Sequence, residues 1–253
     1  MIAIKTINLT KRFNDKTAVN NLNLSIKHGE LYALLGMNGA GKTTTIKMLS
    51  CLIAPTSGDA ILLGNSIVTN PQAVKEKINV SPQETAIAPN LTVKENMELI
   101  AGIYGNNKAA SKSKAQDMLV TFRLENATEN RAKTLSGGMQ RRLSIAMALI
   151  SNPQILFLDE PTVGLDVLAR RELWSAIRKI KGEVTIILTT HYLEEAQELS
   201  DRIGIMSCGE LVAEGTADEL VLQAGAKNFE DAFVTLASDR LVVLSQEDDT
   251  KKS

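Results

Sequence analysis

Cysteine and net charge are both scarce in this sequence. Cys51 and Cys208 are the only cysteines among 253 residues. They are far apart and lack metal-ligand spacing, which argues against a disulfide framework or a zinc site. We expect both thiols to be reduced, cytosolic and buried. With 28 basic and 29 acidic residues the net charge is −1, so we expect no general attraction to nucleic acid or anionic lipid and no nucleic-acid partner.

Long apolar runs are also missing. No stretch approaches the roughly 18 apolar residues of a membrane-spanning helix, and Met1 to Lys5 do not resemble the start of a secretory signal. If the chain works at a membrane, we expect another subunit to supply the span. The apolar fraction of 44% is enough for a substantial core, and the length suits one compact α/β domain.

The segment from Gly36 to Thr44 reads Gly-Met-Asn-Gly-Ala-Gly-Lys-Thr-Thr and matches the phosphate-loop pattern G-x-x-x-x-G-K-[ST]. It follows the apolar run Leu31–Leu35, a predicted strand, and precedes a predicted helix over 43–52. Glycines let the loop turn its N–H groups toward phosphate oxygens. Lys42 can then reach the β and γ phosphates, and the hydroxyl of Thr43 can bind Mg²⁺. A glycine-rich turn that binds nothing is the alternative.

The apolar and polar patterns around this loop predict an alternation of strands and helices. Two half-buried strands, Ile2–Leu9 and Leu22–Ile26, are expected before the loop, joined through a polar turn at residues 14–16. The later expected elements are a turn at 55–58, a strand over 60–63, a helix over 71–77, a strand ending before Gln83, helical segments over 92–121 with breaks near Gly102 and Gly105, a helix over 136–151, a strand over 184–188, and short helices over 217–224 and 228–238.

Two single residues, Phe13 and Gln83, each have two interpretations, and a third, His28, has one. Phe13 can stack on an adenine ring, but a phenylalanine that fills the core or the surface is equally consistent with its position. The Gln83 amide can ligate Mg²⁺ or orient water, or it is a plain surface residue. His28 has no nearby ligand partner, so we expect it to be exposed to solvent.

A second set of motifs follows downstream. The strand predicted over 155–159 ends at Asp159, and Glu160 follows directly. Adjacent carboxylates at the end of a strand can place one beside Mg²⁺ and the other beside an attacking water. Ser136-Gly137-Gly138 opens a predicted helix and forms a second anion site, with a capping hydroxyl and unobstructed N–H groups. A plain helix cap is the alternative for Ser136.

Together these motifs resemble the ATP-binding subunit of ABC transporters over nearly the whole chain. Residues 36–44 match the Walker A loop, Gln83 the Q-loop glutamine, 135–140 the signature motif, 155–160 the Walker B strand and 164–166 the D-loop. His191 falls at the family's switch histidine. Phe13 stands where the family commonly has tyrosine, and Met37 replaces a frequent proline. The sequence segments 82–85, 191–196 and 228–233 resemble those of the drug-export and sodium-export branch of this family, the daunorubicin-resistance type.

The resemblance implies an α/β fold: a P-loop NTPase core with an N-terminal antiparallel β-subdomain and an inserted helical signature subdomain. The ATP-binding domain would span 1–238, with the helical insert at about 84–151, and a partly disordered tail would span 239–253. The implied protein is a cytoplasmic ATPase, peripheral on the inner face of the cell membrane. It would sandwich ATP in a head-to-tail homodimer and power export of a drug, ion or lipid-like substrate through a separately encoded multi-span membrane subunit.

The resemblance also assigns roles to residues. Glu160, His191 and Gln83 would be catalytic, and Thr43, Gln83 and Asp159 would hold Mg²⁺. The ATP-binding residues would be Phe13, Gly36, Asn38, Gly39, Ala40, Gly41, Lys42, Thr43, Thr44, Ser136, Gly137, Gly138 and Asp166. The alternative is a soluble ABC-type ATPase that acts on a ribosome-associated or assembly complex. Such ribosomal proteins normally carry two cassettes per chain and the DNA-repair kind a long coiled coil, and this sequence shows neither feature.

Overall fold

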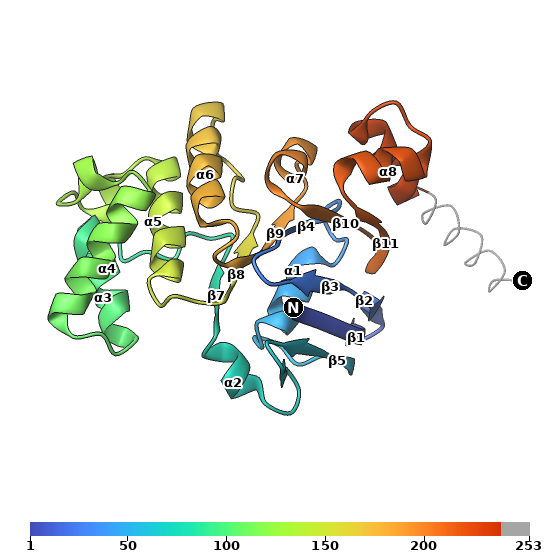
Figure 1. Cartoon of the computed structure of the whole chain (residues 1–253), viewed down its shortest axis with the longest axis horizontal. Coiled ribbons are helices and arrows are strands. Elements are labelled where there is room, and N and C mark those ends of the chain that lie inside the picture. The colour runs from blue at the N-terminus through green and yellow to red at the C-terminus, as the bar shows by residue number, and fades with distance from the viewer. Residues whose placement is uncertain (239–253) are drawn as a thin grey trace, which may run out of the picture. The chain divides into compact units, whose positions relative to one another are not determined.

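The computed structural model describes residues 1–238, which form two compact units (Figure 1). The first unit contains Met1–Lys75 together with the chain from Ile187 onward, and the second contains Glu76–Ile186. Within the described residues, every helix is too short or too polar to cross a bilayer. The prediction of a disordered tail concerns 239–253, which lie outside the described residues.

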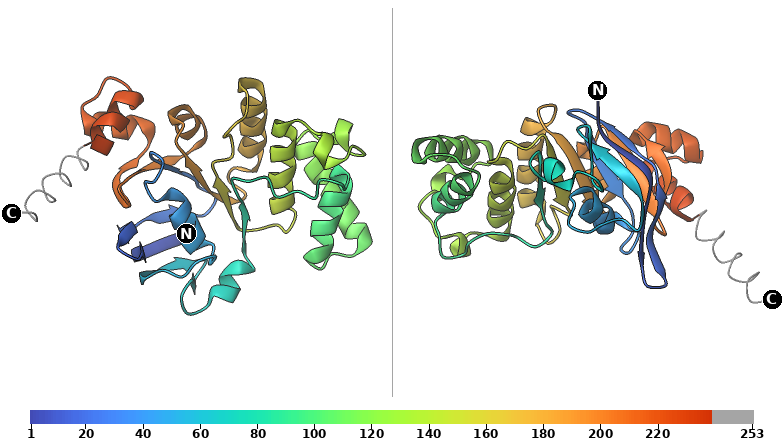
Figure 2. Two further views of the ribbon diagram at one scale, coloured as in Figure 1. Left: turned by 180° about the vertical axis from the view of Figure 1, so that it is seen from behind. Right: turned by 90° about the horizontal axis from the view of Figure 1, so that it is seen from below.

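The first unit contains an antiparallel sheet, as predicted, whose leading hairpin is dark blue in Figure 2. Its strand order is β2-β1-β5-β6, and β3 also pairs with β1. The strands are β1 (Ile2–Phe13), β2 (Lys16–Leu22), β3 (Ser25–Lys27), β5 (Ser57–Leu62) and β6 (Asn65–Ser66). The predicted strand over 22–26 is wrong as a single element, because the chain leaves the sheet at Asn23, whose side chain accepts from the Asn8 backbone N–H at 2.9 Å.

The first unit also contains a parallel pair of strands that leads to the glycine-rich loop. All five residues of β4 (Leu31–Leu35) are buried, as expected for a strand covered on both faces. β10 (Arg202–Ser207) pairs with β4 in parallel and with β11 (Glu210–Gly215) in antiparallel register. The helices of this unit are α1 (Lys42–Leu49), α2 (Pro71–Lys75), α7 (Leu193–Leu199), α8 (Ala217–Ala224) and residues 229–238.

The second unit combines a parallel strand pair with the helices drawn in green and yellow in Figure 1. β7 (Ile78–Ser81) pairs in parallel with β8 (Ile155–Asp159). The helices are α3 (Val93–Ile103), α4 (Lys108–Thr121), α5 (Gly137–Leu149) and α6 (Val167–Ile180), and α5 packs against the other three. β9 (Thr185–Thr190) starts in this unit and ends in the first.

Several predicted boundaries need correction. One break replaces the two predicted near Gly102 and Gly105. α3 continues through Gly102 to Ile103, and the chain turns at 104–107, where the Asn107 side chain caps α4. α1 ends at Leu49 rather than at residue 52, since Cys51 adopts a left-handed φ of 57°. α2 ends at Lys75 rather than at 77, and β5 already begins inside the turn predicted at 55–58. The domain boundaries 1–238 and 84–151 stay predictions.

The cysteine prediction is correct for the covalent state and wrong for burial. Both thiols are free, but Cys208 is exposed and Cys51 is half-buried. Each follows the last regular residues of an element and adopts a left-handed backbone, with φ of 50° and 57°. Turns of this kind lie at the surface, so tertiary position overrides the usual burial of cysteine.

Candidate functional site

The loop between β4 and α1 is held by glycines that the fold requires. Gly41 has a φ of 104°, and a Cβ there would lie 2.5 Å from the carbonyl oxygen of Ala18. A Cβ on Gly36 would lie 2.5 Å from the carbonyl oxygen of Met206. Gly39 has a φ of 85°, and a Cβ added there would have no atom within 4 Å. The loop is therefore packed tightly at its two ends and open at its tip.

Lys42 gives this loop its positive charge. The side chain is buried, and Nζ donates to the carbonyl oxygens of Gly36 at 2.7 Å and Met37 at 3.2 Å. The first turn of α1 contains no acidic residue, and Thr43 and Thr44 are half-buried there. An ammonium, the positive end of a helix and loop N–H groups form an anion site of the kind that binds nucleotide phosphates.

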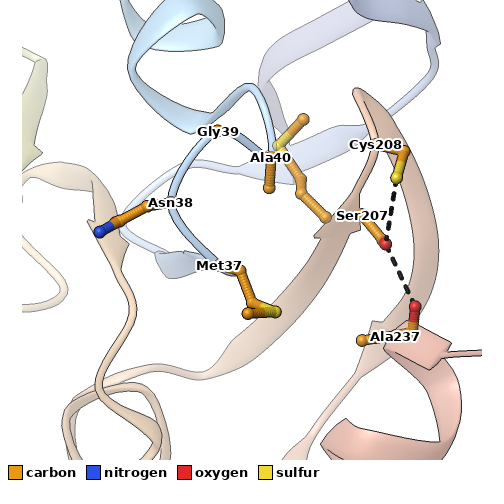
Figure 3. A pocket seen from close by; sticks show the side chains of 8 residues that line it. Met37, Asn38, Gly39, Ala40, Ser207, Cys208 and Ala237 are labelled. Atoms are coloured by element: carbon orange, nitrogen blue, oxygen red, sulfur yellow. Dashed lines mark hydrogen bonds between the residues drawn. The ribbon is translucent and has the colours of Figure 1, made fainter. Parts of the chain in front are cut away.

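The end of β10 supports the loop from one side. A pocket of about 260 Å³ lies between Met37–Ala40 and Met206–Cys208. In Figure 3, Ala237 lies at its edge and the Asn38 side chain is directed away from it. The Ser207 hydroxyl donates to the Ala237 carbonyl oxygen at 3.2 Å. The N–H of Gly209 donates to the Ala40 carbonyl oxygen at 3.1 Å. The loop thus rests on a hydrogen-bonded turn from a distant part of the sequence.

Two further predicted residues lie in the same unit. Phe13 ends β1 and is 48% exposed, with Lys11 Nζ at 5.1 Å from the ring centroid; this exposure excludes the core-filling interpretation. His191 directly follows Thr190, whose carbonyl oxygen accepts from the Gly36 N–H at 3.3 Å. Its ring is half-buried, 4.2 Å from the Tyr192 ring. His28 is exposed, as predicted.

The predicted carboxylates lie in the second unit, at the end of β8. All five residues of β8 are buried, and Asp159 and Glu160 are only 6% and 9% exposed. Glu160 has a left-handed φ of 46°. A non-glycine residue pays about 1–3 kcal/mol for such a conformation, and such residues cluster at functional sites. The strand therefore places two buried carboxylates at its carboxyl end, one of them on a strained backbone.

The second predicted anion site opens α5. The Ser136 hydroxyl accepts a hydrogen bond from the Met139 N–H at 3.3 Å. Ser136 therefore caps the helix, which was the alternative interpretation of this residue. The first turn contains no acidic residue, and Ser136 and Gly137 are exposed. A Cβ on Gly137 would meet nothing within 4 Å, whereas a Cβ on Gly138 would lie 2.6 Å from Ala169 Cβ. Packing thus explains Gly138 but leaves the glycine at 137 unexplained.

Two more predicted residues lie on loops of this unit. Asp166 is exposed and caps α6 by accepting from the Ala169 N–H at 2.8 Å. Gln83 is exposed in the loop after β7, and its backbone carbonyl oxygen accepts from Arg141 at 3.3 Å. Arg141, a buried residue of α5, was not among the predicted site residues. Its signal was a pair of arginines, Arg141 and Arg142, directly before the mostly apolar run 143–149 of α5, because a buried guanidinium requires partners.

The buried strand, glycine-rich loop and helix define a phosphate-binding α/β protein of the P-loop class. Residues 19–163 match the model of the family described as ABC transporter. The daunorubicin/doxorubicin resistance ATP-binding protein DrrA of Streptomyces peucetius is 40% identical over 225 residues, 88% of this chain and 68% of that protein. The chain belongs to the ABC transporter family, in which it is an ATP-binding cassette and an ATPase.

Solved structures agree with this assignment. The ATP-binding subunit of an ABC transporter superposes with a TM-score of 0.81 and 28% identity, covering 92% of this chain and 99% of that one. A dimeric post-hydrolysis state of the ATP-binding cassette MJ0796, bound to ADP and Pi, superposes with a TM-score of 0.75 and 29% identity, covering 84% and 98%. The predicted P-loop NTPase fold is confirmed.

Proposed function

We propose that this chain hydrolyses MgATP as a head-to-tail homodimer and powers export through a separate membrane subunit. The observation that carries the proposal is the presence of two open helix N-termini in one chain. One is the Lys42 loop before α1, and the other is the start of α5 at Ser136 and Gly137. Each ATP would lie between the loop of one protomer and α5 of its partner. The dimeric cassette structure with ADP and Pi supports a dimer that holds nucleotide.

The chemistry assigned to this shared site is phosphoryl transfer to water. Lys42 and the loop N–H groups hold the phosphates, and Phe13 stacks on the adenine. Glu160 polarises the water and His191 holds it in place. The described residues contain no cluster of three His, Cys, Asp or Glu side chains. In this proposal Mg²⁺ would take ligands from the nucleotide phosphates together with Thr43, Asp159 and Gln83, and it would neutralise charge that develops on those phosphates.

Exposed apolar side chains support the proposed interface between the two protomers of the dimer. Val167 and Leu168 directly follow Asp166 and are 56% and 76% exposed. Met37, in the phosphate loop, is 65% exposed. Apolar surface beside a polar site marks a contact surface, and the second protomer would cover it. Asp166 would then link the two nucleotide sites across the dimer.

A second exposed surface lies on α3 and supports a membrane partner. Leu99 and Ile103 are one helical turn apart, and Tyr104 follows; they are 47%, 69% and 51% exposed. We propose that this surface contacts the membrane subunit, which would place the cassette peripherally on the inner face of the membrane. The name of the Streptomyces relative supports drug export, while an ion or lipid-like cargo is equally compatible with this chain.

The shared site is tested with Glu160→Gln and Ser136→Arg. Glu160→Gln removes the base and keeps the shape, so turnover should fall about 10²–10⁴-fold and an ATP-bound dimer should accumulate. Adding Ser136→Arg places bulk where the partner's γ-phosphate must lie, so the double variant should bind ATP but stay monomeric in light scattering. Ser113→Arg, the same change at an exposed position of α4, is the control and should leave the dimer intact.

Wild-type turnover in Glu160→Gln, or a dimer that survives Ser136→Arg, would rule out the shared site. The membrane partner is tested separately, by co-purification with a multi-span protein encoded beside this chain. Ile103→Arg should abolish co-purification, whereas Val120→Arg, at a similarly exposed position on α4, should not. If no membrane protein associates with the wild-type chain, a soluble role replaces export.

A further inference from the structure

Arg141 joins two loops of the second unit through backbone hydrogen bonds. The side chain is 4% exposed, although it carries a full positive charge. Nε donates to the Pro161 carbonyl oxygen at 2.9 Å, and Nη2 donates to that of Asp159 at 3.0 Å. Nη1 donates to the carbonyl oxygens of Pro82 and Gln83, the latter at 3.3 Å. One planar guanidinium therefore binds the segment after β8 and the segment after β7.

The carbonyl groups of Asp159, the last residue of β8, and of Pro161 flank Glu160 on either side. Glu160 has a φ of 46°, a conformation that persists only where the surroundings enforce it. The bonds from Arg141 to residues 159 and 161 hold both neighbouring carbonyl groups, and so limit rotation of the backbone between them. The direction of the Cα–Cβ bond of Glu160, and with it the position of its carboxylate, follows from that backbone.

We propose that Arg141 is a positioning residue. It orients the Glu160 carboxylate toward the attacking water, and it couples that orientation to the loop carrying Gln83. The inference rests on the proposed role of Glu160 as the base. It adds that displacement of the Gln83 loop breaks two of the four described hydrogen bonds of Arg141. The remaining two, to the carbonyl groups on either side of Glu160, then hold the guanidinium less firmly. Pro82 and Gln83 are both exposed, so a contact on this loop is transmitted to the hydrolytic carboxylate.

The shape of arginine is essential to this role. Its donors point in fixed directions within one plane, whereas lysine offers a single flexible ammonium. Arg141→Lys keeps the charge but cannot reach both carbonyl groups beside Glu160 and the Gln83 loop together. A matched control is the next residue, Arg142, which is also buried. Arg142 donates to the carbonyl oxygens of Phe122 and Arg123 and pairs with Glu172, and so binds other segments.

The experiment compares steady-state kcat and KM for MgATP in purified variants, with Tm as a check on folding. Arg141→Lys should lower kcat by about 10-fold or more, since misplacement by about 1 Å can cost 10²-fold, while KM stays within about twofold of wild type. Arg142→Lys should lower Tm and leave kcat of the folded protein near wild type. If Arg141→Lys does not fold, Arg141→Gln, which keeps a side-chain donor, takes its place.

The decisive measurement is the double variant with Glu160→Gln. Because Arg141 acts through Glu160, Arg141→Lys should not slow the residual turnover of Glu160→Gln any further. A second loss of the same size, a rise in KM that accounts for the defect, or wild-type kcat in a folded Arg141 variant would overturn the positioning role. Failure of the proposed function is distinguishable, since Glu160→Gln by itself would then keep wild-type turnover.

Discussion

One added methyl group at either of two neighbouring glycines should separate packing from ligand binding in α5. A Cβ on Gly138 would lie 2.6 Å from Ala169 Cβ, whereas a Cβ on Gly137 would have no neighbour within 4 Å. Gly138→Ala should therefore destabilise the fold. Gly137→Ala should leave stability unchanged and instead weaken formation of the ATP-bound dimer, because its methyl group points into the space proposed for the partner's nucleotide.

The size of the effect at Gly138 follows from this distance. Non-bonded carbon atoms pack at about 3.5–4.0 Å, so α5 and α6 would have to separate by about 1 Å. Overpacking of this kind costs about 1–3 kcal/mol. The better helix propensity of alanine returns at most about 1 kcal/mol. Ala169 is part of α6 and has no side-chain torsion that relieves the contact, so we expect a net loss of about 1–2 kcal/mol.

The assay is urea unfolding of the nucleotide-free monomer, followed by light scattering with MgATP in the Glu160→Gln background. Gly138→Ala should lower the unfolding midpoint, and adding Ala169→Gly should restore much of the loss by removing the clashing carbon. Gly137→Ala should keep the wild-type midpoint but give less dimer. Equal midpoints for the two alanine variants would refute the packing argument, and an unchanged dimer in Gly137→Ala would refute the ligand argument.

Three further predictions concern single side chains. Phe13→Ala should raise the ATP dissociation constant in calorimetry by the equivalent of about 1–3 kcal/mol, while Phe13→Trp should not; equal affinities would leave Phe13 a surface residue. The Tyr32 hydroxyl is buried and donates to Glu214 at 2.8 Å, and burial raises the pKa of Tyr32 well above its usual value. The contribution of Tyr32 to the free energy of unfolding should be complete below about pH 10 and be lost as the pH rises through the raised pKa. Tyr32→Phe has no proton to lose, so its alkaline unfolding should begin at a higher pH than that of the wild type. Identical pH profiles would contradict this. In a thiol titration of the native protein, exposed Cys208 should react before Cys51, whose pKa burial raises; Cys51→Ser should remove only the slow phase.

The local structure of the candidate site was predictable from the sequence where neighbouring residues form it. The buried strand β4, the glycine loop and Lys42 occupy adjacent positions, and any chain with this order places N–H groups and an ammonium at a helix start. The cap at Ser136 and the carboxylates after β8 are equally local. Element boundaries were less accurate, as Gly102 shows, since a glycine inside a packed helix resembles a break in sequence.

Contacts between distant residues were decided by tertiary structure. The Gln83 carbonyl and Arg141 are 58 positions apart, and no sequence pattern encodes which carbonyl groups a buried guanidinium meets. The same holds for Gly137 and Gly138, which look equivalent until Ala169 packs against only one of them. The sequence by itself determined which residues can bind phosphate, because that chemistry depends on neighbouring backbone groups. Only the fold decided which of them are held by packing and which face open space, because burial depends on segments that meet across the chain.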